Sequence, residues 1–238
     1  MNPTVARLTL RGLLGRRRGL LLLVAPALLL AVAALASASS ADAHETADRV
    51  LGALGLGTLV PILGLVVGTG VIATEIDDGS IVYLLAKPLP RWRIITTKLA
   101  VAIGVTWLFS VVPTLLAGLL LVGTQDGVAL GYAVAVLVAG AAYSALFLLL
   151  GVVTRHAVVA GLAYALIWES TVGNFVQGAR TLSVQQWGRA VGEAVAGQNS
   201  ISADVSLAAA VPLLLVVTVA ATVFASVKLA GLTLAGEE

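Results

Sequence analysis

Long apolar stretches, separated by short polar and charged segments, dominate this sequence. Six of them come close to or exceed the length of about 20 residues with which a helix crosses the roughly 30 Å hydrocarbon core of a bilayer. None shows the apolar–polar alternation of a transmembrane strand. The pattern therefore predicts an all-α integral membrane protein with six transmembrane helices. The expected spans are Gly19–Ala36, Leu51–Ala73, Leu99–Gly123, Val128–Val153, Ala157–Val176 and Leu207–Val227.

The composition supports this assignment and excludes most other classes. Hydrophobic residues make up 59% of the 238 residues and charged residues 11%, whereas soluble domains average about 45–50% and about 25%. The absence of Cys excludes disulfides and cysteine metal sites. The net charge of only +2 gives no sign of nucleic-acid binding. The partner expected for most of the surface is therefore the lipid bilayer.

The distribution of Lys and Arg predicts on which side of the membrane each loop lies. Cytoplasmic loops of membrane proteins are enriched in basic residues. With the N-terminus inside, 11 of the 14 basic residues are cytoplasmic, and only Arg49, Arg180 and Arg189 are outside. We therefore expect a multi-pass protein of the cell (plasma) membrane with both termini in the cytoplasm.

The first 18 residues predict an interfacial helix on the inner leaflet. Val5, Leu8 and Leu13 fall near one helical face, and Arg7, Arg11 and Arg18 lie mostly on another, which is typical of a basic amphipathic helix. A disordered basic leader is the alternative. The arginines at 16–18 and the apolar run after them also resemble a secretory signal peptide. That run exceeds the usual apolar core of about 7–15 residues, so we favour a retained first span.

The loop of residues 74–98, between the second and third spans, has the features of a short docking helix. Its acidic start suits a helix N-terminus, where carboxylates complement the helix dipole. Apolar residues then recur with helical spacing until Pro88 and Pro90 end the helix. The segment Arg91–Arg93 follows, as an interfacial anchor. We predict a short amphipathic cytoplasmic helix and a stiff corner; an ordinary loop lying on the membrane is the alternative.

The same loop carries a resemblance to a known family. An acidic residue and a glycine precede a leucine-rich stretch, a proline, an arginine and a lysine, and here these are Glu75, Gly79, Leu84, Leu85, Pro88, Arg91 and Lys98. This order resembles that of permease subunits of ABC-2 type transporters. Six spans, a basic interfacial N-terminal helix and a long outer segment with short helices before the last span are also similar to that family. The resemblance implies a single ABC-2 type transmembrane domain over residues 1–238.

By this resemblance, the chain is the permease subunit of an ABC exporter. Such a subunit forms the translocation pathway in a dimer, either with a second copy or with a paralogue, and is coupled to a separate ABC ATPase subunit. In that family the loop is a coupling helix that docks on the ATPase. The residues implied for this role are Glu75, Asp78, Gly79, Ile81, Leu84, Leu85, Pro88 and Arg91.

The sequence lacks the motif that binds ATP for hydrolysis. A P-loop requires G-x-x-x-x-G-K-[ST], so that backbone N–H groups and the lysine hold the phosphates. The lysines here, Lys87, Lys98 and Lys228, are followed by Pro, Leu and Leu. We therefore expect no cofactor on this chain, with ATP and Mg²⁺ bound by the partner subunit. We also do not expect the chain itself to be an enzyme.

Glu169 is the one charged residue inside an expected span. A charge at the centre of a bilayer costs about 2.5–3.5 kcal/mol on an insertion scale, and charged residues in spans usually mark a pathway or a relay. One interpretation is therefore a polar element of the export pathway or its outer gate. The other is an N-terminal charge for a following outer helix, and the sequence alone does not separate the two.

Two other functional classes remain as alternatives. A secondary transporter without an ATPase partner would need titratable groups near the midplane and often repeated halves, and only Glu169 fits. An intramembrane enzyme would need a nucleophile–base constellation, and the sequence shows none. His44, beside Asp42 and Glu45, lacks the spacing of metal ligands and is interpreted as part of a solvated outer loop, so no metal site is predicted.

Overall fold

The computed structural model describes residues 3–13, 15–39, 42–73, 75, 90–172, 180–196 and 201–231. Every regular element in these ranges is helical, which confirms the all-α prediction. Segments η1 and η3 are π-helical and η2 and η4 are 3₁₀ turns. The elements are α1 (Pro3–Leu13), α2 (Arg16–Ser39), α3 (Ala43–Ala47), η1 (Asp48–Leu59), α4 (Val60–Gly70), α7 (Arg91–Val122), η2 (Gln125–Gly127), α8 (Val128–Val153), α9 (Ala157–Ala163), η3 (Tyr164–Val172), η4 (Arg180–Leu182), α11 (Val184–Ala196) and α12 (Leu207–Gly231).

Four of the expected spans form helices that are long and apolar enough to cross a membrane. They are α7, α8, α12 and the continuous helix Ala43–Gly70, which comprises α3, η1 and α4. The first and fifth expected spans also form helices, α2 and α9–η3, but their described apolar stretches, Leu22–Ala38 and Ala157–Glu169, are shorter. Six crossings therefore remain a prediction.

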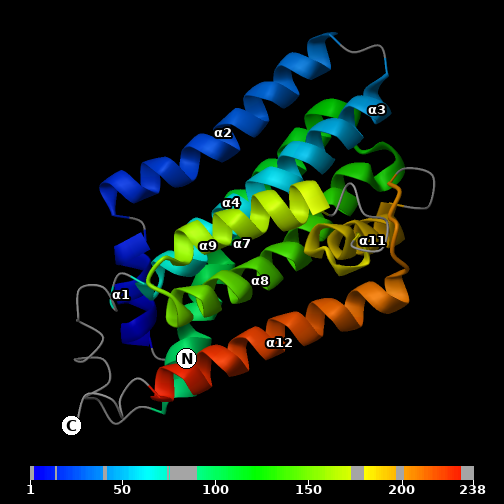
Figure 1. Cartoon of the computed structure of the whole chain (residues 1–238). Helices are drawn as coiled ribbons and strands as arrows, with labels where there is room; N and C mark the ends of the chain where they lie inside the picture. Colours follow the sequence, from blue (N-terminus) through cyan, green and yellow to red (C-terminus); the bar gives the residue numbers. More distant parts are fainter. Residues whose placement is uncertain are drawn as a thin grey trace.

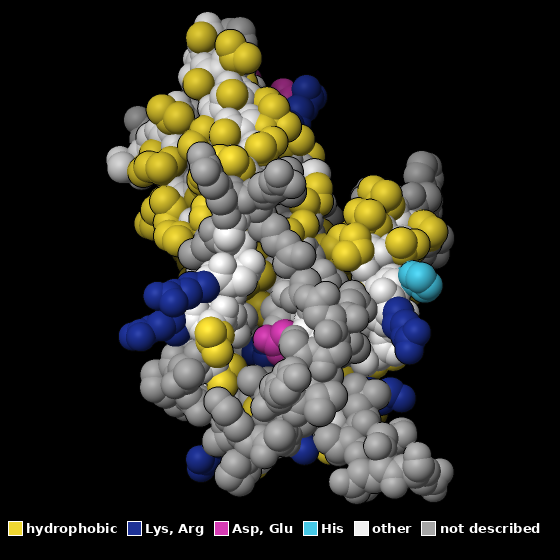
Figure 2. All heavy atoms as spheres, turned by 90° about the vertical axis from the view of Figure 1, so that its left-hand side faces the viewer, with side chains coloured by type: hydrophobic (Ala, Val, Ile, Leu, Met, Phe, Trp, Pro, Cys, Tyr) yellow, Lys and Arg dark blue, Asp and Glu magenta, His cyan; other side chains and the backbone are white. Residues whose placement is uncertain are grey.

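Helices α2, α4, α8, α9 and α12 run roughly parallel to one another (Figure 1). Helix α8 is the central element, because it packs against α4, α7, α11 and α12. Helix α1 and the C-terminal end of α12 lie at one end of the bundle, whereas α3 and α11 lie at the other (Figure 1). Figure 2 looks onto the end that carries α1, and Lys and Arg side chains are spread around it. The end with α1 is therefore the one that the charge distribution predicts to be cytoplasmic. After this prediction, we call it the inner end and the opposite end the outer end.

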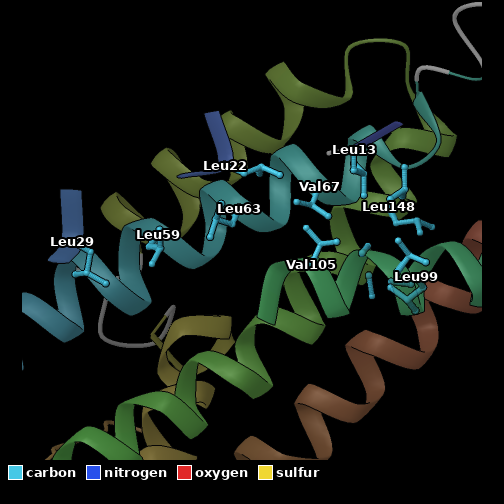
Figure 3. Packing of buried hydrophobic residues seen from close by; sticks show 14 of the residues in the cluster. Leu13, Leu22, Leu29, Leu59, Leu63, Val67, Leu99, Val105 and Leu148 are labelled. Atoms are coloured by element: carbon cyan, nitrogen blue, oxygen red, sulfur yellow. The ribbon is translucent and has the colours of Figure 1, made fainter. Parts of the chain in front are cut away.

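Close packing holds the bundle together. Because lipid tails are as apolar as leucine, helices in a bilayer associate mainly through van der Waals contact and small residues. A Cβ on Gly64 would lie 2.9 Å from Tyr143 Cβ, and one on Gly68 would lie 3.0 Å from Phe147 Cβ, so these glycines bring α4 and α8 into contact. Figure 3 shows side chains of a second, larger buried cluster, among them Leu13, Leu22, Leu29, Leu59, Leu63, Val67, Leu99, Val105 and Leu148, whereas Tyr143 and Phe147 belong to a smaller one.

The N-terminal helix forms as predicted, with one difference in its buried face. In α1, Val5 and Leu13 are buried, but Leu8 is 58% exposed and Thr9 is buried in its place. Residues 5, 9 and 13 are separated by four positions and therefore stack on one side of a helix. The Thr9 hydroxyl is satisfied within the helix, because it donates a hydrogen bond to the carbonyl of Val5 at 2.9 Å.

Candidate coupling and outer sites

The structure describes only the two ends of the predicted coupling loop. Glu75 follows the helix of the second span, and Arg91 is the first residue of α7. The other implied coupling residues lie outside the described residues, and their role stays a prediction. These residues are Asp78, Gly79, Ile81, Leu84, Leu85 and Pro88.

A buried ion pair joins the two ends of this loop. Lys98 Nζ donates hydrogen bonds to Glu75 Oε1 at 2.7 Å and to the carbonyl oxygen of Val71 at 2.5 Å. The Lys98 side chain is fully buried, whereas the Glu75 side chain is 28% exposed. Because a buried charge without a partner is costly, the ammonium group holds the end of α4 against the start of α7.

Sequence reasoning placed Glu75 and Lys98 in one motif but did not predict their contact. Lys98 lies four residues after Ile94 and three before Val101, and all three are buried on one face of α7. A lysine on the buried face of an apolar helix needs an acceptor. The nearest acidic residues in the sequence lie in the segment Glu75–Asp78, which could have been identified as the source of that acceptor.

The start of α7 has the features of an interfacial anchor. Pro90 precedes the helix in an extended conformation, with φ −64° and ψ 134°, as expected for a proline that ends one segment and starts another. The Arg93 guanidinium carbon lies 5.3 Å from the centre of the Trp92 ring, and Trp92 is 55% exposed. This cation–π pair places an aromatic and a cationic group at the inner end of the span.

Glu169 is buried, with 3% exposure, and is fully engaged at the outer end of η3. It accepts hydrogen bonds from the Tyr164 hydroxyl at 2.9 Å, from the backbone N–H of Val184 at 3.1 Å and from the Ser183 hydroxyl. Val184 is the first residue of α11, and Ser183 Oγ also accepts from the N–H of Gln186. The carboxylate therefore lies at the N-terminus of an outer helix, where negative charge is stabilised.

This geometry fits the interpretation of Glu169 as an N-terminal charge for an outer helix, although the helix is α11, 15 residues further along the chain. Whether Glu169 also lines the pathway stays a prediction.

Helix α11 forms in the predicted outer segment and is inserted against α8. A Cβ on Gly192 would lie 2.8 Å from the carbonyl oxygen of Gly131, and one on Gly131 would lie 2.7 Å from the Cβ of Ala196. On the same helix, Trp187 is buried and its Nε1 donates to the carbonyl of Thr181 at 2.8 Å. The glycines thus fix the distance between α11 and α8, and α11 is part of the packed bundle.

A further polar cluster at the outer end was not predicted from the sequence. Tyr132 of α8 donates a hydrogen bond from its hydroxyl to Asp48 Oδ1 of η1. Arg189 Nη2 of α11 lies 3.6 Å from the same oxygen. The three residues are far apart in the sequence, and no motif connects them. His44 Nε2 lies 3.3 Å from Asp126 Oδ2, so a polar contact joins α3 to η2.

Together these observations define a multi-pass helical membrane protein. An ion pair between Glu75 and Lys98 joins the two ends of its inner loop, and α11 is packed into the bundle against α8. The sequence matches the family described as ABC-2 family transporter protein over residues 14–183. This match covers more than half of the chain, and the chain therefore belongs to that family, as the resemblance in the loop predicted. A comparison with curated proteins finds no match.

Proposed function

We propose that the chain is the permease subunit of an ABC exporter in the plasma membrane, with both termini in the cytoplasm. Two permease chains would form the pathway, and a separate ABC ATPase would bind ATP and Mg²⁺. Membership of the ABC-2 transporter family supports the transporter role. The observation that carries the coupling role is the buried Glu75–Lys98 pair at the base of the cytoplasmic loop.

The ion pair makes the loop suited to transmit force. Lys98 belongs to α7 and binds both Glu75 and the carbonyl of Val71 at the end of α4. Helices α4 and α7 both pack against α8. A displacement of the loop by the ATPase would therefore move two spans together instead of being absorbed at a flexible joint.

The contact with the ATPase is assigned to the apolar residues of the loop. Ile81, Leu84 and Leu85 recur at i, i+3 and i+4 and would form one face of a short helix. An apolar face on a cytoplasmic loop requires a partner surface. A cleft of the ATPase would provide that surface, and closure of the two ATPase subunits would move the loops of both permease chains.

Purification from native membranes tests this proposal. The tagged chain should retain a protein with a P-loop, identified by mass spectrometry, and the complex should hydrolyse ATP. The matched variants are Lys98→Met, which removes the buried cation, and Arg155→Gln, which removes an exposed cation at an inner helix corner. Lys98→Met should lower the coupling of hydrolysis to transport, and Arg155→Gln should not. Purification without any ATPase would instead favour a secondary transporter.

A further inference from the structure

An open pocket of about 410 Å³ lies at the outer end of the bundle, between η1 and α11. It is separate from the ion pair at the inner end and from the residues that bind Glu169. Its polar lining residues are Asp48, Arg49, Thr58, Gln185, Gln186 and Arg189. The volume falls within the range of about 300–1,000 Å³ that is typical of small-ligand sites.

Two glycines of η1 allow polar side chains of α11 to lie directly against its backbone. A Cβ on Gly52 would collide with Arg189 Nη2, and a Cβ on Gly57 would lie 2.9 Å from Gln185 Nε2. Gln185 Nε2 also lies 3.5 Å from the carbonyl oxygen of Gly52. The lining is therefore held by specific contacts, and it includes a π-helical segment, a feature that is frequent at functional sites.

The charges of the pocket favour an anionic ligand. Among the described residues of its lining, Asp48 is the only acidic one, and it is already engaged by the Tyr132 hydroxyl and by Arg189. Arg49 pairs with Glu45 at 2.5 Å, but the two side chains are 76% and 60% exposed. Such exposed pairs contribute little, so Arg49 can exchange partners at small cost.

We propose that this pocket binds an oxyanion, namely a phosphate or carboxylate carried by a lipid head group or by a soluble molecule. Arg49 and Arg189 supply guanidinium groups, whose planar donors match the geometry of carboxylate and phosphate oxygens. The carboxamides of Gln185 and Gln186 supply further N–H donors. The site is independent of the ATPase partner, so its failure and the failure of the proposed function are distinguishable.

Thermal unfolding of the full chain in phosphatidylcholine nanodiscs tests the proposal, with two separate ligands. One series adds increasing fractions of phosphatidylglycerol to the bilayer, and the other adds soluble glycerol 3-phosphate. The variants are Arg49→Gln, which changes an exposed side chain, and Arg189→Gln, which changes a mostly buried one. Arg155→Gln, at the opposite end of the bundle, is the control.

We expect one of the two ligands to raise the melting temperature of the wild-type protein and of Arg155→Gln. Arg189→Gln removes a mostly buried guanidinium group and should weaken the apparent affinity about tenfold or more. Arg49→Gln removes an exposed one and should weaken it less, by about threefold. A response to phosphatidylglycerol identifies a head-group site, and a response to glycerol 3-phosphate identifies a soluble ligand. No response to either ligand, or an equal loss in Arg155→Gln and Arg49→Gln, would overturn the proposal.

Discussion

Breaking the Glu75–Lys98 pair from either side should destabilise the protein by different amounts. Among the described residues, Glu75→Ala leaves the fully buried Lys98 ammonium with the Val71 carbonyl as its one remaining partner. Leaving such a charge uncompensated costs about 3–5 kcal/mol. Lys98→Met leaves the carboxylate of Glu75, which at 28% exposure can be hydrated. Lys98→Met should therefore lower the free energy of unfolding by less, about 1.5–3 kcal/mol, which is the contribution of a hydrogen bond to a charged group.

The double variant separates the pair from the other contacts of its members. When both charges are removed, neither is left buried, and replacing a buried ion pair by apolar groups is often neutral. The effect of Glu75→Ala with Lys98→Met should therefore be smaller than the sum of the single effects, by about 2 kcal/mol. Unfolding titrations in mixed micelles with a denaturing detergent measure all four proteins. Additivity to within about 0.5 kcal/mol would refute the reasoning.

Two further predictions concern topology and Glu169. Because the chain has no Cys, single cysteines at Asp42 and Ser202, both exposed at the outer end, should react with an impermeant thiol reagent in intact cells, and one at His156 should not. Labelling of His156→Cys from outside would contradict the predicted orientation. If Glu169 lines the pathway, Glu169→Gln should lower transport while the chain still assembles with its ATPase. If Glu169 only supplies an N-terminal charge to an outer helix, the substitution should be tolerated, because such dipole effects are about 0.3–1 kcal/mol. Transport at the wild-type rate would remove the pathway role.

The spans could be predicted from the sequence wherever their ends coincide with a change in polarity. The fourth span, Val128–Val153, has the bounds that its apolar run predicted. The third begins at Arg91 instead of Leu99, because Lys98 interrupted the apolar run. In the folded chain, the charge of Lys98 is compensated by Glu75. The helix therefore continues through Lys98, although the apolar run by which the span was predicted stops at this residue.

The second span differs for the same reason. It extends outward to Ala43, because Asp48 is bound by Tyr132 and Arg189 and because Arg49 pairs with Glu45. Glu45 and Arg49 are an i,i+4 pair within the helix. The partners of Asp48 come from α8 and α11, so a local pattern could not predict them. The contacts of Glu169 with Ser183 and Val184 could not be predicted from the sequence either. They depend on how α11 packs against α8 through Gly131 and Gly192.

The most direct test of the central claim is whether the loop binds the ATPase through its apolar face. Leu84→Asp places a charge on that face, and an unpaired charge in a buried interface costs several kcal/mol. The measurement is the amount of ATPase retained by the tagged, membrane-inserted chain. The account predicts that the wild-type chain retains the ATPase and that Leu84→Asp loses it. Full retention of the ATPase together with normal export by Leu84→Asp would contradict the account.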